Sequence, residues 1–100
     1  MSTRAKQFDP KAPAEIVPIT FDFSALLTSI DSVVISVQIR VGADPNVASM
    51  PLAAPVINGG VVQQLIQQGV DGVEYSIRAD AVAGMQKYAL NGHLPVIELS

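Results

Sequence analysis

The chain has 100 residues, no cysteine and a charged fraction of 15%. That length is typical of one domain with one hydrophobic core, and a chain without cysteine has neither a disulfide framework nor a thiolate metal site. No segment has the apolar length of a signal peptide or of a transmembrane helix. We therefore expect a soluble protein that is made in a cytoplasm and has no membrane partner.

The charges are few and unevenly distributed along the chain. Globular domains usually contain about 25% charged residues, and low charge is typical of surfaces that another subunit covers. Residues 1–11 carry a net charge of +2, whereas the rest of the chain carries −5. A basic segment on an acidic body fits docking on an acidic neighbour as well as a disordered terminus. Three cations without interleaved aromatic residues do not form a nucleic-acid surface, so no such partner is expected.

An extended N-terminal arm is predicted for residues 1–14, which are polar, contain two prolines and show no periodicity. The folded domain is then residues 15–100. Its first strand is predicted between residues 16 and 23; the inward face would carry Val17, Ile19, Phe21 and Phe23. Pro18 cannot donate to a ladder, so this strand lies at a sheet edge or begins after Pro18. Asp22 is expected to cap the turn at Ser24-Ala25.

The most regular alternation lies in residues 32–41, where the inward positions are all β-branched. These inward residues would be Val33, Ile35, Val37, Ile39 and Val41. After a turn at residues 42–46, Pro51 and Pro55 indicate that residues 47–57 form an edge strand or an extended polyproline-like run. Asn58-Gly59-Gly60 predicts a tight hairpin turn with positive φ.

Residues 61–68 are ambiguous, because their apolar pairs recur every four residues and fit a helix at least as well as a strand. Residues 71–83 predict a strand with one dry face; that face would carry Val73, Tyr75, Ile77, Ala79 and Ala81. Tyr75 also has the position of the tyrosine corner of immunoglobulin-like sandwiches.

A last strand is predicted within residues 86–99, with Tyr88, Leu90, Leu94 and Val96 on one side and Asn91-Gly92 as an interrupting bulge or second hairpin. Six or seven short strands joined by Gly, Pro and Asn turns predict an all-β fold. We expect an immunoglobulin-like antiparallel β-sandwich with an extended N-terminal arm. Residues 32–41 and 71–83 would be the central strands of its two stacked sheets.

Motifs for catalysis or metal binding were not found in the sequence. His93 is the single histidine and fits a surface or turn position better than a ligand position. The nine carboxylates are scattered and lack the spacing of a calcium loop; Glu74 and Asp80 beside Arg78 fit a solvated charge ladder. No G-x-S-x-G elbow or glycine-rich phosphate loop is present. We therefore expect that the protein is not an enzyme and that it binds neither a cofactor nor a metal.

Three short motifs resemble small tailed-bacteriophage proteins of the fibre–tail adaptor family. They are KQFDPKAPAE at residues 6–15, TFDFS at residues 20–24 and GVEYSIR at residues 72–78. The resemblance implies an immunoglobulin-like virion component that joins tail fibres or neighbouring tail parts, and it brings no catalytic residues with it.

From this resemblance we expect a structural adaptor of a phage tail, made in the host cytoplasm and present in multiple copies in a symmetric assembly. Its partners would be other virion proteins, reached through the N-terminal arm and through an edge strand near residues 50–57 or the final strand. Phe8, Asp9 and Pro10 are the expected contacts, with Phe8 as a buried anchor; the alternative is that Phe8 folds back on its own domain. Alternatives are a head–tail connector, a capsid decoration protein, a carbohydrate-binding module with an exposed aromatic platform, or a small hydrolase with clustered acids.

Overall fold

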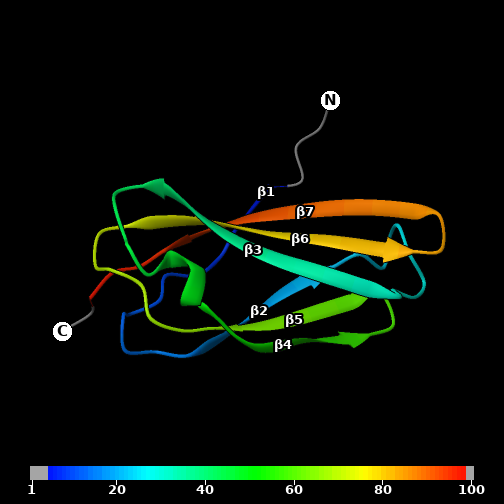
Figure 1. Cartoon of the computed structure of the whole chain (residues 1–100), viewed down its shortest axis with the longest axis horizontal. Helices are drawn as coiled ribbons and strands as arrows, with labels where there is room; N and C mark the ends of the chain where they lie inside the picture. Colours follow the sequence, from blue (N-terminus) through cyan, green and yellow to red (C-terminus); the bar gives the residue numbers. More distant parts are fainter. Residues whose placement is uncertain (1–4, 99–100) are drawn as a thin grey trace.

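The computed structural model describes residues 5–98 and shows two β-sheets stacked on one core (Figure 1). One sheet has four strands in the order β1-β7-β6-β3, and the other has three in the order β2-β5-β4. The strands are β1 (Ala5–Gln7), β2 (Val17–Asp22), β3 (Ser32–Val41), β4 (Pro51–Asn58), β5 (Val61–Ile66), β6 (Glu74–Ala83) and β7 (Gln86–Pro95), with a 3-10 turn η1 (Val47–Ser49) before β4. The predicted all-β sandwich is confirmed.

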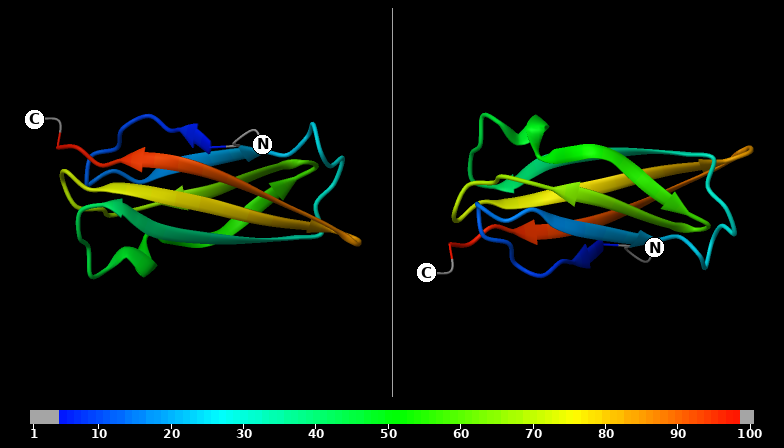
Figure 2. Two further views of the ribbon diagram at one scale, coloured as in Figure 1. Left: turned by 90° about the horizontal axis from the view of Figure 1, so that it is seen from above. Right: turned by 90° about the horizontal axis from the view of Figure 1, so that it is seen from below.

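The two flanks of the sandwich, where the edges of the sheets meet, are formed by different strand pairs (Figure 2). β1 and β2 lie along one flank, and β3 and β4 lie along the other. Within the described residues β1 pairs with β7 in parallel, whereas every other pair of neighbouring strands is antiparallel. The predicted hairpin turn joins β4 to β5, where Gly59 has a φ of 61°, a conformation that glycine adopts without strain.

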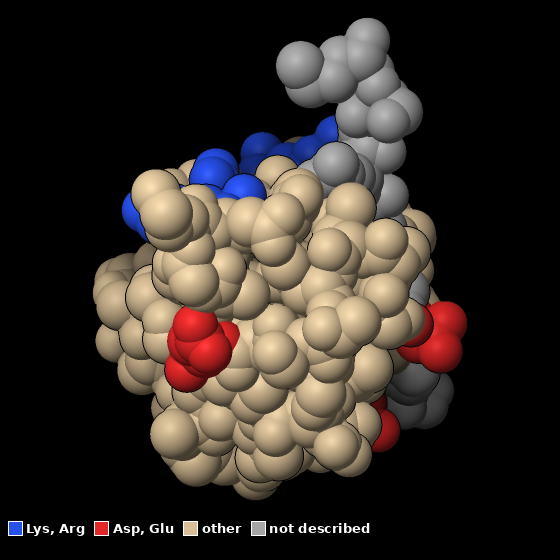
Figure 3. All heavy atoms as spheres, turned by 90° about the vertical axis from the view of Figure 1, so that its right-hand side faces the viewer, with Lys and Arg blue, Asp and Glu red and all other residues tan. Residues whose placement is uncertain are grey.

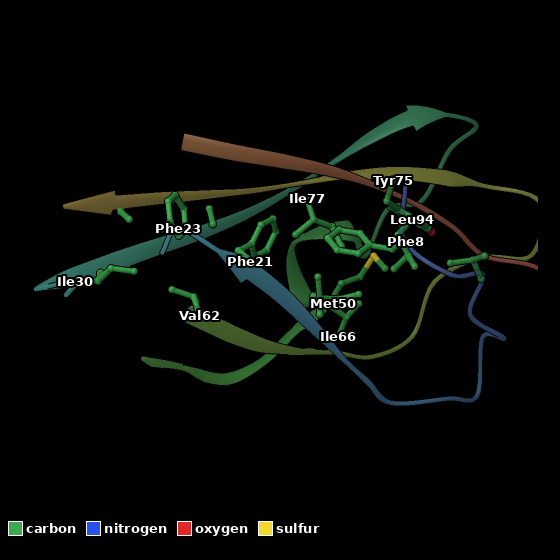
Figure 4. Close-up of a cluster of buried hydrophobic side chains, with 14 of the residues drawn as sticks. Phe8, Phe21, Phe23, Ile30, Met50, Val62, Ile66, Tyr75, Ile77 and Leu94 are labelled. Carbon is green, nitrogen blue, oxygen red and sulfur yellow. The ribbon is translucent and has the colours of Figure 1, made fainter. Parts of the chain in front are cut away.

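The core between the sheets contains the predicted inward faces of β2 and β6 (Figure 4). Side chains of both strands are buried there, together with residues of β5, β7 and the connecting segments. The buried members of the two predicted faces are Ile19, Phe21, Phe23, Val73, Tyr75, Ile77, Ala79 and Ala81. The period-2 pattern therefore gave the correct side for both strands, because each has one face against the other sheet.

β3 has the predicted bounds but not the predicted place. It pairs with β6 in the same sheet and forms the end of that sheet, so residues 32–41 and 71–83 are not the central strands of two different sheets. Val41 was expected to point inward, but its side chain is 57% exposed. A register shift between Ile39 and Val41 turns the last residue out of the alternation.

The ambiguous residues 61–68 contain strand β5, so the helical alternative is wrong. Val62 and Ile66 point into the core, and Gln64 lies between them, also buried. The Gln64 Nε2 atom donates to the carbonyl oxygens of Leu52 and Ala53, both at 3.0 Å. These carbonyls belong to a bulge in β4. A polar residue on the inward face satisfies backbone acceptors there, and this residue obscured the strand pattern.

β7 runs without interruption through Asn91-Gly92, so the predicted bulge or second hairpin is also wrong. Asn91 pairs with Arg78 and Gly92 with Ile77 in an unbroken antiparallel register. β7 is also paired on its other side, by β1, at residues 91–93. The final strand is therefore not the free edge that the sequence indicated.

Tyr75 forms the tyrosine corner that its position predicted. Its hydroxyl group donates to Asp44 Oδ2 at 2.8 Å and accepts the N–H of Val70, also at 2.8 Å. Burial and the hydrogen bond to Asp44 raise the pKa of Tyr75 to about 12. The corner connects the start of β6 to the loop before β4 and to the turn after β5.

The raised pKa of Tyr75 predicts a loss of stability at alkaline pH. The unfolded chain releases this proton near pH 10, but the folded chain holds it until about pH 12. The stabilisation from the hydroxyl is therefore complete below pH 10 and is lost as pH rises through 12. Tyr75→Phe is expected to be less stable than wild type at pH 8 by about 1–3 kcal/mol, with most of this gap gone at pH 12. Urea unfolding at both pH values measures the gap, and an unchanged gap would contradict the prediction.

Candidate functional site

From residue 5 onward, the N-terminal segment lies on the folded domain. β1 pairs with residues 91–93 of β7. The Phe8 N–H then donates to the His93 carbonyl at 2.9 Å, and the Lys11 N–H to the Pro95 carbonyl at 3.1 Å. Residues 5–11 thus run along β7 as an additional edge, and residues 1–4 of the predicted arm lie outside the described residues.

Phe8, the expected anchor for a partner, is buried in the core of its own chain. Its ring is 7% exposed and meets the Phe21 ring edge to face, with 5.6 Å between ring centroids. The ring lies directly over Gly92, where an added Cβ atom would be 2.0 Å from Phe8 Cε2. Glycine in the middle of β7 is therefore explained by the close approach of this ring.

Lys11 was counted as a cation of the arm, yet its side chain is completely buried. Its Nζ atom donates to the carbonyl oxygens of Ala12, Pro13 and Gln68. Burial lowers the pKa of Lys11, and the charge of Glu15 partly opposes this effect. A buried ammonium group needs such acceptors, so Lys11 fastens the N-terminal segment to the turn after β5 and is not a docking residue.

A groove of about 360 Å³ separates the N-terminal segment from β2. Gln7, Phe8, Asp9 and Pro10 line one wall, and residues 17–20 line the other. The structure thus brings the three predicted contact residues together on one wall. Asp9 and Pro10 are exposed, whereas Phe8 forms the inner end of the wall.

The free edge of β2 borders this groove. Phe23 N–H donates to Gly60 O at 2.8 Å, which fixes the alternation of bonded and non-bonded pairs along β2 and β5. By that alternation Pro18, opposite Leu65, points its backbone toward the open edge. Proline has no N–H to present there, so Pro18 protects the edge against strand pairing and confirms the predicted edge position.

Charged side chains of the strands gather on the outer face of the four-stranded sheet. Arg40 and Glu74 form an ion pair between β3 and β6 at 3.0 Å, and Arg78 and Asp80 form a second pair along β6 at 2.9 Å. Both pairs are partly exposed, as the predicted solvated ladder requires. At the end of the molecule seen in Figure 3, most of the surface is neither basic nor acidic.

The acids that a hydrolase would use have separate structural partners. Asp22 Oδ1 accepts the Ser24 N–H, which confirms the predicted cap, and Asp31 Oδ2 accepts the Gly84 N–H. Asp80 pairs with Arg78. Within residues 5–98 no three His, Cys, Asp or Glu side chains form a group that could hold a metal ion, and no helix in this part of the chain is long and apolar enough to cross a membrane.

The aromatic side chains offer no exposed platform for a sugar ring. The five aromatic residues of the chain all lie in the described part. Tyr88 is half-buried, and the other four are buried; they are Phe8, Phe21, Phe23 and Tyr75. The stacking surface that the carbohydrate-binding alternative requires is therefore missing.

The fold is that of a small β-sandwich. A sequence profile of the family described as Podophage GP4 fiber-tail adaptor protein gp77 matches residues 11–85, which is three quarters of the chain. The chain therefore belongs to this family of fibre–tail adaptors, as the sequence motifs indicated. A fibre–tail adaptor has a structural role in the virion. No curated protein and no solved structure matches the chain.

Proposed function

We propose that this protein is a non-enzymatic adaptor of a phage tail, which joins tail fibres or neighbouring tail components through its N-terminal segment and its strand edges. It is made in the host cytoplasm, occupies the virion tail in multiple copies of a symmetric assembly, and has other virion proteins as partners. Membership of the fibre–tail adaptor family supports the role. The low charge of the chain supports a surface that other subunits cover.

The groove beside β2 is the observation that carries the proposed contact. One wall presents Asp9 and Pro10 to solvent on a segment that backbone hydrogen bonds hold to β7. Phe8 supports this wall from inside the core. A rigid wall binds at a lower entropy cost than a flexible arm does. We assign Asp9 and Pro10 to direct contact with a partner and Phe8 to holding them in place.

Charge reversal at Asp9 tests this contact. Phage lacking the gene would be complemented with wild type, Asp9→Lys or Glu98→Lys, and the adaptor in purified virions would be quantified. Glu98 is also exposed and lies outside the groove. Because both variants replace an acidic residue with lysine, they change the net charge equally. Asp9→Lys is expected to be incorporated about tenfold less than Glu98→Lys, since reversing a contacting charge costs more than about 1.4 kcal/mol.

Two results would contradict this proposal at different levels. Equal incorporation of the two lysine variants would remove Asp9 from the contact. Absence of the wild-type protein from purified tails would overturn the adaptor role itself.

A further inference from the structure

The edges of the two sheets differ in how well they are protected against a new strand. β2 carries Pro18, and β4 carries Pro51 and Pro55 together with a bulge between Leu52 and Val56. Proline and bulges are the devices by which proteins close sheet edges. β3, the edge strand of the four-stranded sheet opposite β1, is ten residues long and contains no proline, and its register shift lies only at its end, between Ile39 and Val41. Among the described strands, β3 therefore presents the long unprotected edge.

The backbone groups that β3 presents can be assigned from the pairing of β6. Val96 N–H donates to Val73 O, so by alternation Tyr75 and every second residue after it bond to β7, and the residues between them bond to β3. The β3 residues opposite the first set therefore direct N–H and C=O toward the open edge. These residues form the outward-bonding row, which is Val33, Ile35, Val37 and Ile39.

The side chains of the same four residues are incompletely buried on the inner side of the sheet. Their side chains point toward the core but are only half-buried. Across the flank, Ile57 of β4 faces the same way as the buried Val62 and is still 37% exposed. The β3–β4 seam, defined by the outward-bonding row and Ile57, thus has free backbone groups and apolar side chains that the described residues cover only in part.

The opposite flank shows what fills such a seam in this fold. There residues 5–11 run along β7, and Phe8 from that segment fills the space over Gly92 and against Phe21. One extended segment provides both the backbone hydrogen bonds to the sheet edge and the apolar side chain that fills the space. At the β3–β4 seam no described strand pairs with the outer edge of β3 (Figure 2). Backbone groups that can pair and apolar side chains are both available there.

We propose that the β3–β4 seam receives one extended segment of another virion protein, which pairs with β3 and inserts alternating apolar side chains against Val33, Ile35, Val37, Ile39 and Ile57. The segment contains β-branched or aromatic residues at every second position and no proline where it bonds to β3. A single strand is the occupant because at the opposite flank one extended segment, residues 5–11, provides both the backbone pairing and the buried apolar side chain. This inference rests on the proposed adaptor function and names its partner surface.

A proline in β3 tests the ladder. Val37→Pro removes an outward N–H and leaves the bonds of Gln38 and Ser36 to β6, so the fold is expected to survive. Val37→Ala removes side-chain atoms from the same position but keeps the N–H. Val37→Pro is expected to be incorporated into virions at least about tenfold less than Val37→Ala, which corresponds to one lost ladder bond and its distortion. Thermal unfolding of both variants checks the fold.

A matched cysteine pair keeps the test decisive if the proline variant fails to fold. The chain has no native cysteine, and Val34 and Val56 are 65% and 63% exposed, on the large and small sheets respectively. Maleimide is expected to label Val34→Cys at least about tenfold more slowly in virions than in the free protein, because the added strand lies about 5 Å from β3. Label on Val56→Cys is expected to be slowed less.

The outcomes separate this inference from the adaptor function. If wild type is present in tails but Val34→Cys reacts as fast there as in the free protein, the β3 inference is wrong and the adaptor function stands. If the purified chain alone forms dimers in which Val34→Cys is protected, the occupant is a second copy and the proposed partner segment is wrong. If wild type is missing from tails, the adaptor function fails first.

Discussion

Replacing Gly92 with alanine is expected to lower the free energy of unfolding by about 3–5 kcal/mol, the usual cost of removing a buried phenylalanine ring. The new Cβ atom would lie 2.0 Å from Phe8 Cε2 and 2.5 Å from Cζ. Neither atom belongs to a flexible chain end, so either the ring leaves the core or β7 moves. Urea unfolding followed by circular dichroism measures the change.

A double-mutant cycle identifies the ring as the cause. Phe8→Ala alone is expected to cost about 3–5 kcal/mol through the cavity that it leaves. In the double variant, the methyl group at position 92 occupies space that the ring has vacated. The double variant is therefore expected to lose little more free energy of unfolding than Phe8→Ala alone, which is a strong departure from additivity. Additive losses would show that Phe8 does not lie on Gly92.

Lys11→Met is expected to lower the free energy of unfolding by about 2–4 kcal/mol, since buried carbonyl oxygens lose an ammonium donor. Methionine keeps a side chain of similar length. The acceptors are the carbonyls of Ala12, Pro13 and Gln68. The segment that Lys11 fastens should also open more often. Amide hydrogen exchange is expected to be faster at Phe8 and Lys11, whose N–H groups bond to β7.

Lys87→Met is the matched control for this substitution. Lys87 is an exposed residue of β7 and undergoes the same chemical change. Exposed substitutions usually change stability by no more than about 0.5 kcal/mol. If the two methionine variants lose equal stability, the carbonyl cage around Lys11 contributes nothing.

Strands with one buried face could be predicted from the sequence, because only one face of such a strand packs against the other sheet. The alternation in β6 gave its buried face from Val73 to Ala81, and the alternation in β2 did the same. Turn chemistry was equally local: Asp22 caps the turn at Ser24, and Gly59 takes the positive φ. Each of these features depends on residues close together in the chain.

The errors arose where a distant residue decided the local structure. Gln64 reads as part of a helical pattern because its partners, the carbonyls of Leu52 and Ala53, belong to another strand. Gly92 reads as a turn residue because the ring that requires it comes from Phe8, more than eighty positions earlier. The single signal for the second case was an isolated glycine within an otherwise regular strand, which also marks a close approach.

The contact residues of the candidate site stay a prediction. Phe8, Asp9 and Pro10 line one wall of the groove beside β2, and they lie just before the residues that the family profile matches. The sequence placed Phe8 and Lys11 on a free arm, whereas both are buried in their own domain. β4 is an edge strand, as the prolines near residues 50–57 indicated, but the sequence did not predict that β3 is an edge strand as well.

The sequence alone established an all-β fold without cysteine, a regular buried face on β6, a tyrosine corner at Tyr75 and the motifs of fibre–tail adaptors. Only the tertiary structure decided that residues 5–11 cover one flank and that β3 leaves the other open. Side-chain periodicity records which face of a strand is buried, because that alternates from residue to residue. It does not record which strand lies beside which, since the backbone groups that pair strands are the same at almost every residue.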